Sequence, residues 1–165
     1  MNNRIKYLFM DVDGTLTDGK IYMGCNGEIM KAFNIKDGAG IHDVLIPSGI
    51  IPVIITGRKS EIVMQRCKEL GISDVYQGVS DKAGVMEEIL KNNSCCFDSV
   101  AYIGDDINDL KCMKLVIQGN GVVGCPMDAV DSVKSISSFV SSKKGGEGAV
   151  REFIEFLIKI EKRLQ

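Results

Sequence analysis

Five aspartates stand directly after two short apolar runs of this chain. They are Asp11 and Asp13 after "IKYLFM", and Asp105, Asp106 and Asp109 after "VAYIG". Carboxylates that share one crevice repel one another unless a cation lies between them, and oxygen ligands with open positions suit Mg²⁺ when the substrate carries a phosphate. A calcium loop of the EF-hand type is excluded at Asp11, because Leu16 and Tyr22 stand where it requires glycine and glutamate. The pattern therefore predicts a magnesium site.

Polar residues that complement these carboxylates follow two further apolar runs. They are Thr56, Gly57 and Arg58 after "IIPVII", and Lys82 beyond "DVYQG". One carboxylate can attack phosphorus and form an aspartyl-phosphate, and a second can protonate the leaving oxygen. Thr56 and Lys82 can hold the phosphoryl oxygens. Each signal alone is weak, since a lone lysine usually lies on the surface, but together they predict phosphoryl transfer, most simply to water.

Short β-rich runs alternate with helical patterns along the chain. The runs cover 5–10, 50–55, 74–78, 100–104 and either 115–119 or 121–124, and the helical patterns cover 60–70 and 81–90. This alternation predicts βαβ units and a mainly parallel sheet with helices on both faces. Ligands bind beyond the carboxyl ends of such strands, so the fold would bring the polar residues together. At 165 residues, we expect a single domain over 1–165.

Two segments depart from this alternation. In 20–35, the dipeptide Asn26-Gly27 favours a type I′ turn and hence a projecting β-hairpin inserted in the domain. The apolar side chains expected on its exposed face are Tyr22, Met23, Met30 and Phe33, in some combination. Residues 149–164 are typical of an amphipathic helix, and the polar, glycine-rich linker 141–149 before it is expected to be mobile.

The composition argues against several classes of protein. A net charge of −2 and a pI near 5.5 argue against a nucleic-acid-binding surface. No run approaches the ~20 apolar residues of a membrane span, and the N-terminal residues lack a signal-peptide core, so we expect a cytoplasmic protein without membrane contact. The six cysteines show no CxxC spacing and are expected to be reduced thiols, most of them buried.

The motifs "DVDGT", "ITG", a lone lysine and "GDDIND" resemble those of the haloacid dehalogenase superfamily of phosphatases, and the resemblance covers nearly the whole chain. It implies a three-layer α/β/α, Rossmann-like parallel sheet, with Asp11 as nucleophile and Asp13 as general acid/base. The implied phosphate holders are Thr56 and Lys82. The implied Mg²⁺ ligands are Asp11, the backbone carbonyl of Asp13, and Asp105, with Asp106 and Asp109 as supporting groups.

Longer stretches, among them "IITGRKSEIVMQRCKELGI", "YQGVSDK" and "GGEGAVREF", closely resemble the 3-deoxy-D-manno-octulosonate (KDO) 8-phosphate phosphatase family. This resemblance implies a capless, Mg²⁺-dependent hydrolase of a small anionic sugar phosphate, with a place in lipopolysaccharide or surface-glycan biosynthesis. It also implies a homotetramer whose hairpins form a central barrel and whose subunits help to close each other's sites. Gly57, Arg58 and Arg151 are then expected to bind phosphate or substrate, because arginine recognises a carboxylate through a two-pronged set of donors.

Several alternatives stay open. One is hydrolysis of an N-acylneuraminate or 2-keto-3-deoxynonulosonate 9-phosphate. Arg58 in "TGRK" favours the octulosonate enzymes over this alternative, whereas Glu147 in "GGEG" stands where the octulosonate enzymes carry arginine. Another is a non-catalytic oligomeric module that regulates a cytidylyltransferase, against which the intact catalytic set argues. A third is phosphoryl transfer to an acceptor other than water. Asp37 is expected to cap the helix that follows it, and His42 to be a helix residue rather than a catalytic base.

Overall fold

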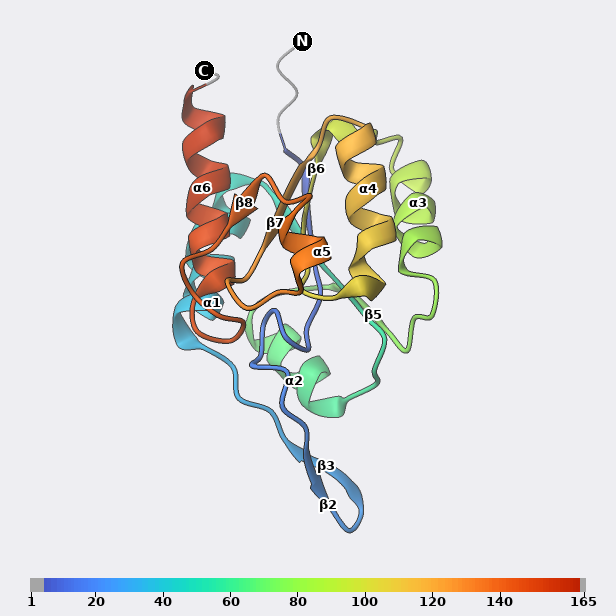
Figure 1. The fold of residues 1–165 in the computed structure, drawn as a ribbon, viewed down its shortest axis with the longest axis vertical. Coiled ribbons are helices and arrows are strands. Elements are labelled where there is room, and N and C mark those ends of the chain that lie inside the picture. Colours follow the sequence, from blue (N-terminus) through green and yellow to red (C-terminus); the bar gives the residue numbers. More distant parts are fainter. Residues whose placement is uncertain (1–4, 164–165) are drawn as a thin grey trace.

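A computed structural model describes residues 5–163, and its main body is a six-stranded parallel β-sheet (Figure 1). The strands lie in the order β5-β4-β1-β6-β7-β8. They are β1 (Tyr7–Met10), β4 (Ile51–Thr56), β5 (Asp74–Gln77), β6 (Val100–Ile103), β7 (Val122–Cys125) and β8 (Phe139–Val140). The predicted parallel sheet is confirmed, and of the two candidate runs between 115 and 124 the second forms the strand.

Helices cover both faces of this sheet. The α-helices are α1 (Ile35–Ala39), α2 (Glu61–Glu69), α3 (Lys82–Asn92), α4 (Leu110–Gln118), α5 (Asp131–Lys134) and α6 (Ala149–Arg163). Shorter π or 3₁₀ turns cover Gly40–Leu45, Ile46–Ser48, Phe97–Ser99 and Ile107–Asp109. One hydrophobic cluster joins the sheet to α2 and α6, and a second joins its other face to α3, α4 and α5. The result is the three-layer α/β/α arrangement that the sequence predicts.

Strand β1 is buried on both faces, which explains its unbroken apolar sequence. Alternate side chains enter the two clusters, Leu8 and Met10 on one face, Tyr7 and Phe9 on the other. Successive side chains of a strand point to opposite faces, so a strand with helices on both sides needs apolar residues throughout. Met10 pairs in register with Ile54 of β4 and Ile103 of β6. The carboxyl ends of these three strands therefore lie side by side.

A two-stranded antiparallel hairpin, β2 (Tyr22–Gly24) and β3 (Gly27–Met30), projects from the body of the molecule (Figure 1). Its turn is not the type I′ turn expected, because Asn26 does not take a positive φ and only Gly27 does, at 111°. The large exposed apolar side chains on or beside it are Ile21, Met23, Ile29 and Met30. Phe33, expected on this exposed face, packs against the core instead.

The glycine-rich segment before α6 packs against the loop that follows β1, in contrast to the mobile linker expected. The amide of Gly146 donates a hydrogen bond to the carbonyl oxygen of Thr15, at 3.1 Å. A Cβ atom on Gly145 would lie 1.8 Å from the carbonyl oxygen of Gly14, so only glycine fits there. Close backbone contact, not flexibility, is the reason for glycine at this position.

Asp37 caps α6 and not the helix that follows it in sequence. Its buried carboxylate accepts hydrogen bonds from the amides of Gly148, at 3.2 Å, and Arg151, at 2.7 Å. Asp37 itself lies within α1, and that helix is capped by Asn34, whose side chain accepts from the amide of Lys36 at 2.8 Å. The expectation for Asp37 is wrong because the start of α6, distant in sequence, lies beside it in the fold.

All six cysteines are free thiols, and Cys67, Cys112 and Cys125 are buried. Burial raises the pKa of each of these three thiols, to about 11 for Cys67 and about 12 for Cys112. Thiols of this kind behave as apolar core groups rather than as nucleophiles. Within residues 5–163, no helix is both long and apolar enough to cross a membrane.

Candidate active site

Lys82 contacts both Asp11 and Asp109 at the carboxyl end of the sheet. Lys82 Nζ lies 2.9 Å from Asp11 Oδ2 and 2.8 Å from Asp109 Oδ1. All three residues are buried. Burial lowers the pKa of Lys82, but the two carboxylates raise it by more, so the lysine is charged. It begins α3 and is the cation between two carboxylates, not the surface residue that a lone lysine usually is.

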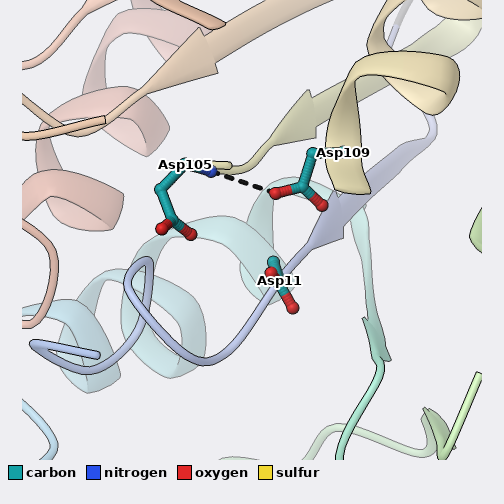
Figure 2. Close-up of side chains that lie close together, drawn as sticks. All are labelled: Asp11, Asp105 and Asp109. Atoms are coloured by element: carbon teal, nitrogen blue, oxygen red, sulfur yellow. Dashed lines mark hydrogen bonds between the residues drawn. The ribbon is translucent and has the colours of Figure 1, made fainter. Parts of the chain in front are cut away.

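Asp109 holds this cation in place and is itself fully bonded. Its Oδ1 also accepts a hydrogen bond from the hydroxyl of Tyr102, at 2.7 Å. Its Oδ2 accepts from the backbone amides of Asp105, at 3.1 Å (Figure 2), and Asp106, at 3.3 Å. Sequence reasoning missed Tyr102, although a tyrosine in a fully buried strand signals a hydroxyl that needs a partner.

Asp105 lies next to Asp11 and Asp109 (Figure 2). It is oriented by the loop that follows β1. Thr15 Oγ1 donates to Asp105 Oδ1 at 2.9 Å. Gly14 has a φ of 92°, and a Cβ atom there would lie 2.1 Å from Asp105 Oδ2. The glycine of "DVDGT" therefore allows the close approach of this carboxylate, while the threonine aims it.

Burial and crowding disfavour the charged forms of these carboxylates. The pKa of Asp11 is raised to about 6, first by burial and then by the charge of Asp109, with Lys82 acting in the opposite direction. Burial raises the pKa of Asp105 to about 7, and the charges of Asp11 and Asp109 add to the effect. One oxygen from each of the three carboxylates lies within 4.8 Å of the others. A divalent cation among them would neutralise the excess negative charge, so these residues fit a hard ion such as Mg²⁺.

The side chain of Asp13 is held by residues outside this cluster. Lys31 Nζ donates to Asp13 Oδ1 and lies 2.9 Å from Glu28 Oε1. Arg58 Nε is 4.0 Å from Asp13 Oδ2. Burial lowers the pKa of Lys31, but its contacts with the carboxylates of Asp13 and Glu28 raise it by more. Sequence reasoning missed Lys31 and Glu28, whose one signal was charge within an otherwise apolar hairpin.

The remaining predicted site residues divide between the strand ends and the surface. Thr56 is buried at the end of β4, and Gly57 and Arg58 follow it as exposed residues. Asp106 is exposed and caps the turn Ile107–Asp109, accepting from the amide of Ile107 at 2.7 Å.

The structure does not bring Arg151 to this cluster. Its Nε lies 2.6 Å from Glu155 Oε1 on α6, and its side chain packs against Gly40. Its contact with substrate stays a prediction. His42 is exposed, with Nδ1 2.6 Å from Asp43 Oδ1.

Comparison with known proteins gives close relatives over nearly the whole chain, although no protein-family model matches it. The chain is 42% identical over 160 residues to the 3-deoxy-D-manno-octulosonate 8-phosphate phosphatase KdsC of Escherichia coli strain K12, a match that covers 97% of this chain and 82% of the relative. The crystal structure of the Yersinia pestis phosphatase of the same name superposes with a TM-score of 0.88 at 41% identity, over 97% of this chain and 84% of that one.

A third relative is the phosphatase of this name from Moraxella catarrhalis, whose structure is in complex with magnesium ion, phosphate ion and KDO. It has a TM-score of 0.88 at 39% identity, over 97% of this chain and 89% of that one. The four motifs, their convergence at one end of a parallel sheet and these matches agree. The chain therefore belongs to the 3-deoxy-D-manno-octulosonate 8-phosphate phosphatase family of the haloacid dehalogenase superfamily, a family of phosphoric monoester hydrolases.

Proposed function

We propose that this protein hydrolyses KDO 8-phosphate to KDO and inorganic phosphate, with Mg²⁺ as cofactor and Asp11 as nucleophile. The observation that carries the proposal is the placement of Asp11, one oxygen of which lies 2.9 Å from the buried Lys82 ammonium while the carboxylate shares a cluster with Asp105 and Asp109. A covalent phosphatase mechanism requires a nucleophilic carboxylate and an acid/base residue near it. Asp11, next to the fixed Lys82 cation, can be the first, and Asp13, two positions further along the chain, can be the second.

The chemistry divides into two displacements at phosphorus. In the first, an Asp11 oxygen attacks phosphorus, the bond from phosphorus to the sugar oxygen breaks, and Asp13 donates a proton to that oxygen. In the second, water attacks phosphorus, the bond from phosphorus to the Asp11 oxygen breaks, and Asp13 takes a proton from the water. Inorganic phosphate leaves and both side chains return to their starting states.

Positive charge and hydroxyl donors around Asp11 would stabilise the phosphoryl group in both steps. Lys82 and the Thr56 hydroxyl would contact its oxygens. Asp11, Asp105 and the backbone carbonyl of Asp13 would hold Mg²⁺, which supplies the charge that offsets repulsion between the carboxylates and the incoming phosphate. The Moraxella catarrhalis complex with magnesium, phosphate and KDO supports this cofactor and this substrate class.

Arg58 is the side chain best placed to meet the sugar acid. It follows β4 beside Asp13, and its side chain is 44% exposed, so its guanidinium can donate hydrogen bonds to a carboxylate that enters from solvent. Gly57 precedes it and would lie near the phosphate.

The exposed hairpin supports assembly into a homotetramer. Its strands have three and four residues and, within residues 5–163, pair only with each other, while Met23 and Ile29 are 62% and 63% exposed. Such a hairpin is only marginally stable alone, and an exposed apolar surface of this kind marks a contact site.

The free thiols fit a reducing compartment, the cytoplasm.

The test is release of inorganic phosphate, with Mg²⁺ and with EDTA, from KDO 8-phosphate, a nonulosonate 9-phosphate and simple sugar phosphates. We expect KDO 8-phosphate to give the highest kcat/KM, EDTA to abolish the reaction, and Asp11→Asn to lower turnover by about 10³-fold or more with the fold intact. Preference for the nonulosonate would overturn the substrate assignment, and an active Asp11→Asn enzyme would overturn the nucleophile.

A further inference from the structure

Asp13 differs from the other acidic residues of the site in what holds it. Asp11 accepts from the amide of Val12 at 2.8 Å, and Asp109 accepts from two amides and a tyrosine hydroxyl. Asp105 accepts from Thr15 Oγ1. Within residues 5–163, the one hydrogen bond to the Asp13 carboxylate comes from Lys31. The acid/base residue is therefore anchored from the hairpin and not from the sheet.

The Lys31 side chain is buried and held by contacts with two carboxylates. Its side chain is 1% exposed and lies between two carboxylates, Asp13 and Glu28. Glu28 Oε2 in turn accepts from Ser60 Oγ, directly before α2. A continuous chain of contacts therefore runs from the start of α2 through the hairpin to Asp13, and it defines the position of the Lys31 ammonium.

The geometry points to Lys31 as a positioning residue for Asp13: it binds Oδ1 and so sets the rotation of the carboxyl group that exchanges a proton with the leaving oxygen. This inference rests on the proposed role of Asp13 as acid/base. A proton-transfer group must sit within hydrogen-bond reach of its target, and a displacement of about 1 Å costs about 10²-fold in rate. Without Lys31, nothing else in the described chain hydrogen-bonds this half-buried carboxylate.

A purely electrostatic role for Lys31 is separable from a positioning role. Lys31→Met leaves the group formed by Asp13, Glu28, Lys31 and Arg58 one positive charge short. The double variant Lys31→Met/Glu28→Gln removes one charge of each sign and so keeps the net charge of this group. It also leaves no unpaired Glu28 carboxylate on β3, which protects the fold if the single variant is unstable.

The readout is the dependence of kcat/KM on the leaving group, because kcat/KM covers the steps up to cleavage of the ester. The sugar alkoxide of KDO 8-phosphate requires a proton as it leaves, whereas p-nitrophenolate leaves from p-nitrophenyl phosphate without one. Asp13→Asn is the reference and should lower kcat/KM by about 10²-fold or more for the sugar phosphate and by far less for the aryl ester. The matched control is Lys20→Met, since Lys20 is an exposed lysine paired with Asp18 just before the hairpin.

We expect Lys31→Met and the double variant each to lower kcat/KM for KDO 8-phosphate by about tenfold or more, and for p-nitrophenyl phosphate by less than about twofold. Lys20→Met should change neither. An equal fall on both substrates, or a double variant that recovers the wild-type rate, would overturn the positioning role while Asp13→Asn keeps its selective defect. If Asp13→Asn itself shows no selectivity, the proposed acid/base role fails, and the inference fails with it.

Discussion

At the carboxyl end of the sheet, charged groups are buried and contact partners on other strands and helices. On the hairpin, apolar groups are exposed, and its two strands pair only with each other among the described residues. Lys82 joins the start of α3 to the loops after β1 and β6 through two carboxylates. On the hairpin, Met23, Ile29 and Met30 are all at least half exposed.

The contrast shows that the two regions depend on different sources of order. The strand-end site is held by the core, because its residues extend from strands that are buried on both faces. The hairpin has too little apolar contact within one chain to order itself, and its fixed point is the ion pair of Lys31 at its base. Changes at the first should therefore affect chemistry and stability together, and changes on the exposed apolar face of the second should affect assembly.

The largest effect is expected from Lys82→Met. The change leaves Asp11 and Asp109 as buried carboxylates without their cation, so we expect a loss of about 3–5 kcal/mol in the free energy of unfolding and about 10²-fold or more in kcat. Urea denaturation and phosphate release measure the two. Lys111→Met is the control, since the pair Lys111–Asp81 is exposed to solvent and should contribute little to stability. Equal losses in both variants would contradict the contrast.

On the hairpin, Met23→Lys combined with Ile29→Lys should abolish assembly and leave the sheet intact. Two lysines on the exposed apolar face oppose its burial against other subunits, and surface changes alter monomer stability by about 0.5 kcal/mol or less. If the proposed homotetramer forms through the hairpin, light scattering should show a fall from four chains to one chain of 18.0 kDa, with an unchanged circular dichroism spectrum. An unchanged mass would mean that the hairpin is not the assembly surface.

The metal site should bind Mg²⁺ more tightly as the pH rises. Both carboxyl groups have folded-state pKa values above the ordinary 3.8, about 6 for Asp11 and about 7 for Asp105. In the metal-free protein they contribute stability that is fully present below pH 3.8 and is lost as the pH rises through 6 and 7. Mg²⁺ requires the ionised forms, so its apparent affinity should fall by about tenfold or more from pH 8 to pH 6.

Thermal unfolding with Mg²⁺ and with EDTA at pH 5.5 and pH 8 measures this linkage. The rise in Tm on addition of Mg²⁺ should be larger at pH 8 and should disappear in Asp105→Asn. A rise of the same size at both pH values would contradict a site built on these two carboxylates.

The smallest effect is expected from Tyr102→Phe. It removes one of four hydrogen bonds to Asp109 and keeps the packing of β6, so we expect a loss of about 1 kcal/mol in stability and a few-fold loss in kcat. Tyr7→Phe on β1 is the control, because its hydroxyl makes no hydrogen bond to another residue within 5–163. Equal losses in both variants would show that the Tyr102 hydroxyl has no role beyond packing.

The sequence by itself was enough to predict that Asp11, Lys82 and Asp105 lie together, with Thr56 at the end of a neighbouring strand. Asp11, Thr56 and Asp105 follow apolar runs, Lys82 lies beyond a further strand, and the carboxyl ends of parallel strands share one edge of a sheet. The alternation of strand and helix patterns likewise determined the layers, because burial on both faces of a strand is visible in its composition.

Only the tertiary structure decided which partners hold these residues. Tyr102 and Asp109 meet across the end of β6, Lys31 reaches Asp13 from the hairpin, and Asp37 caps α6 from more than a hundred positions away. The glycine-rich segment before α6 reads as flexible, yet Gly145 is needed for close contact with the loop after β1. Periodicity and spacing report local conformation and burial, whereas these contacts depend on distances between segments that no local pattern encodes.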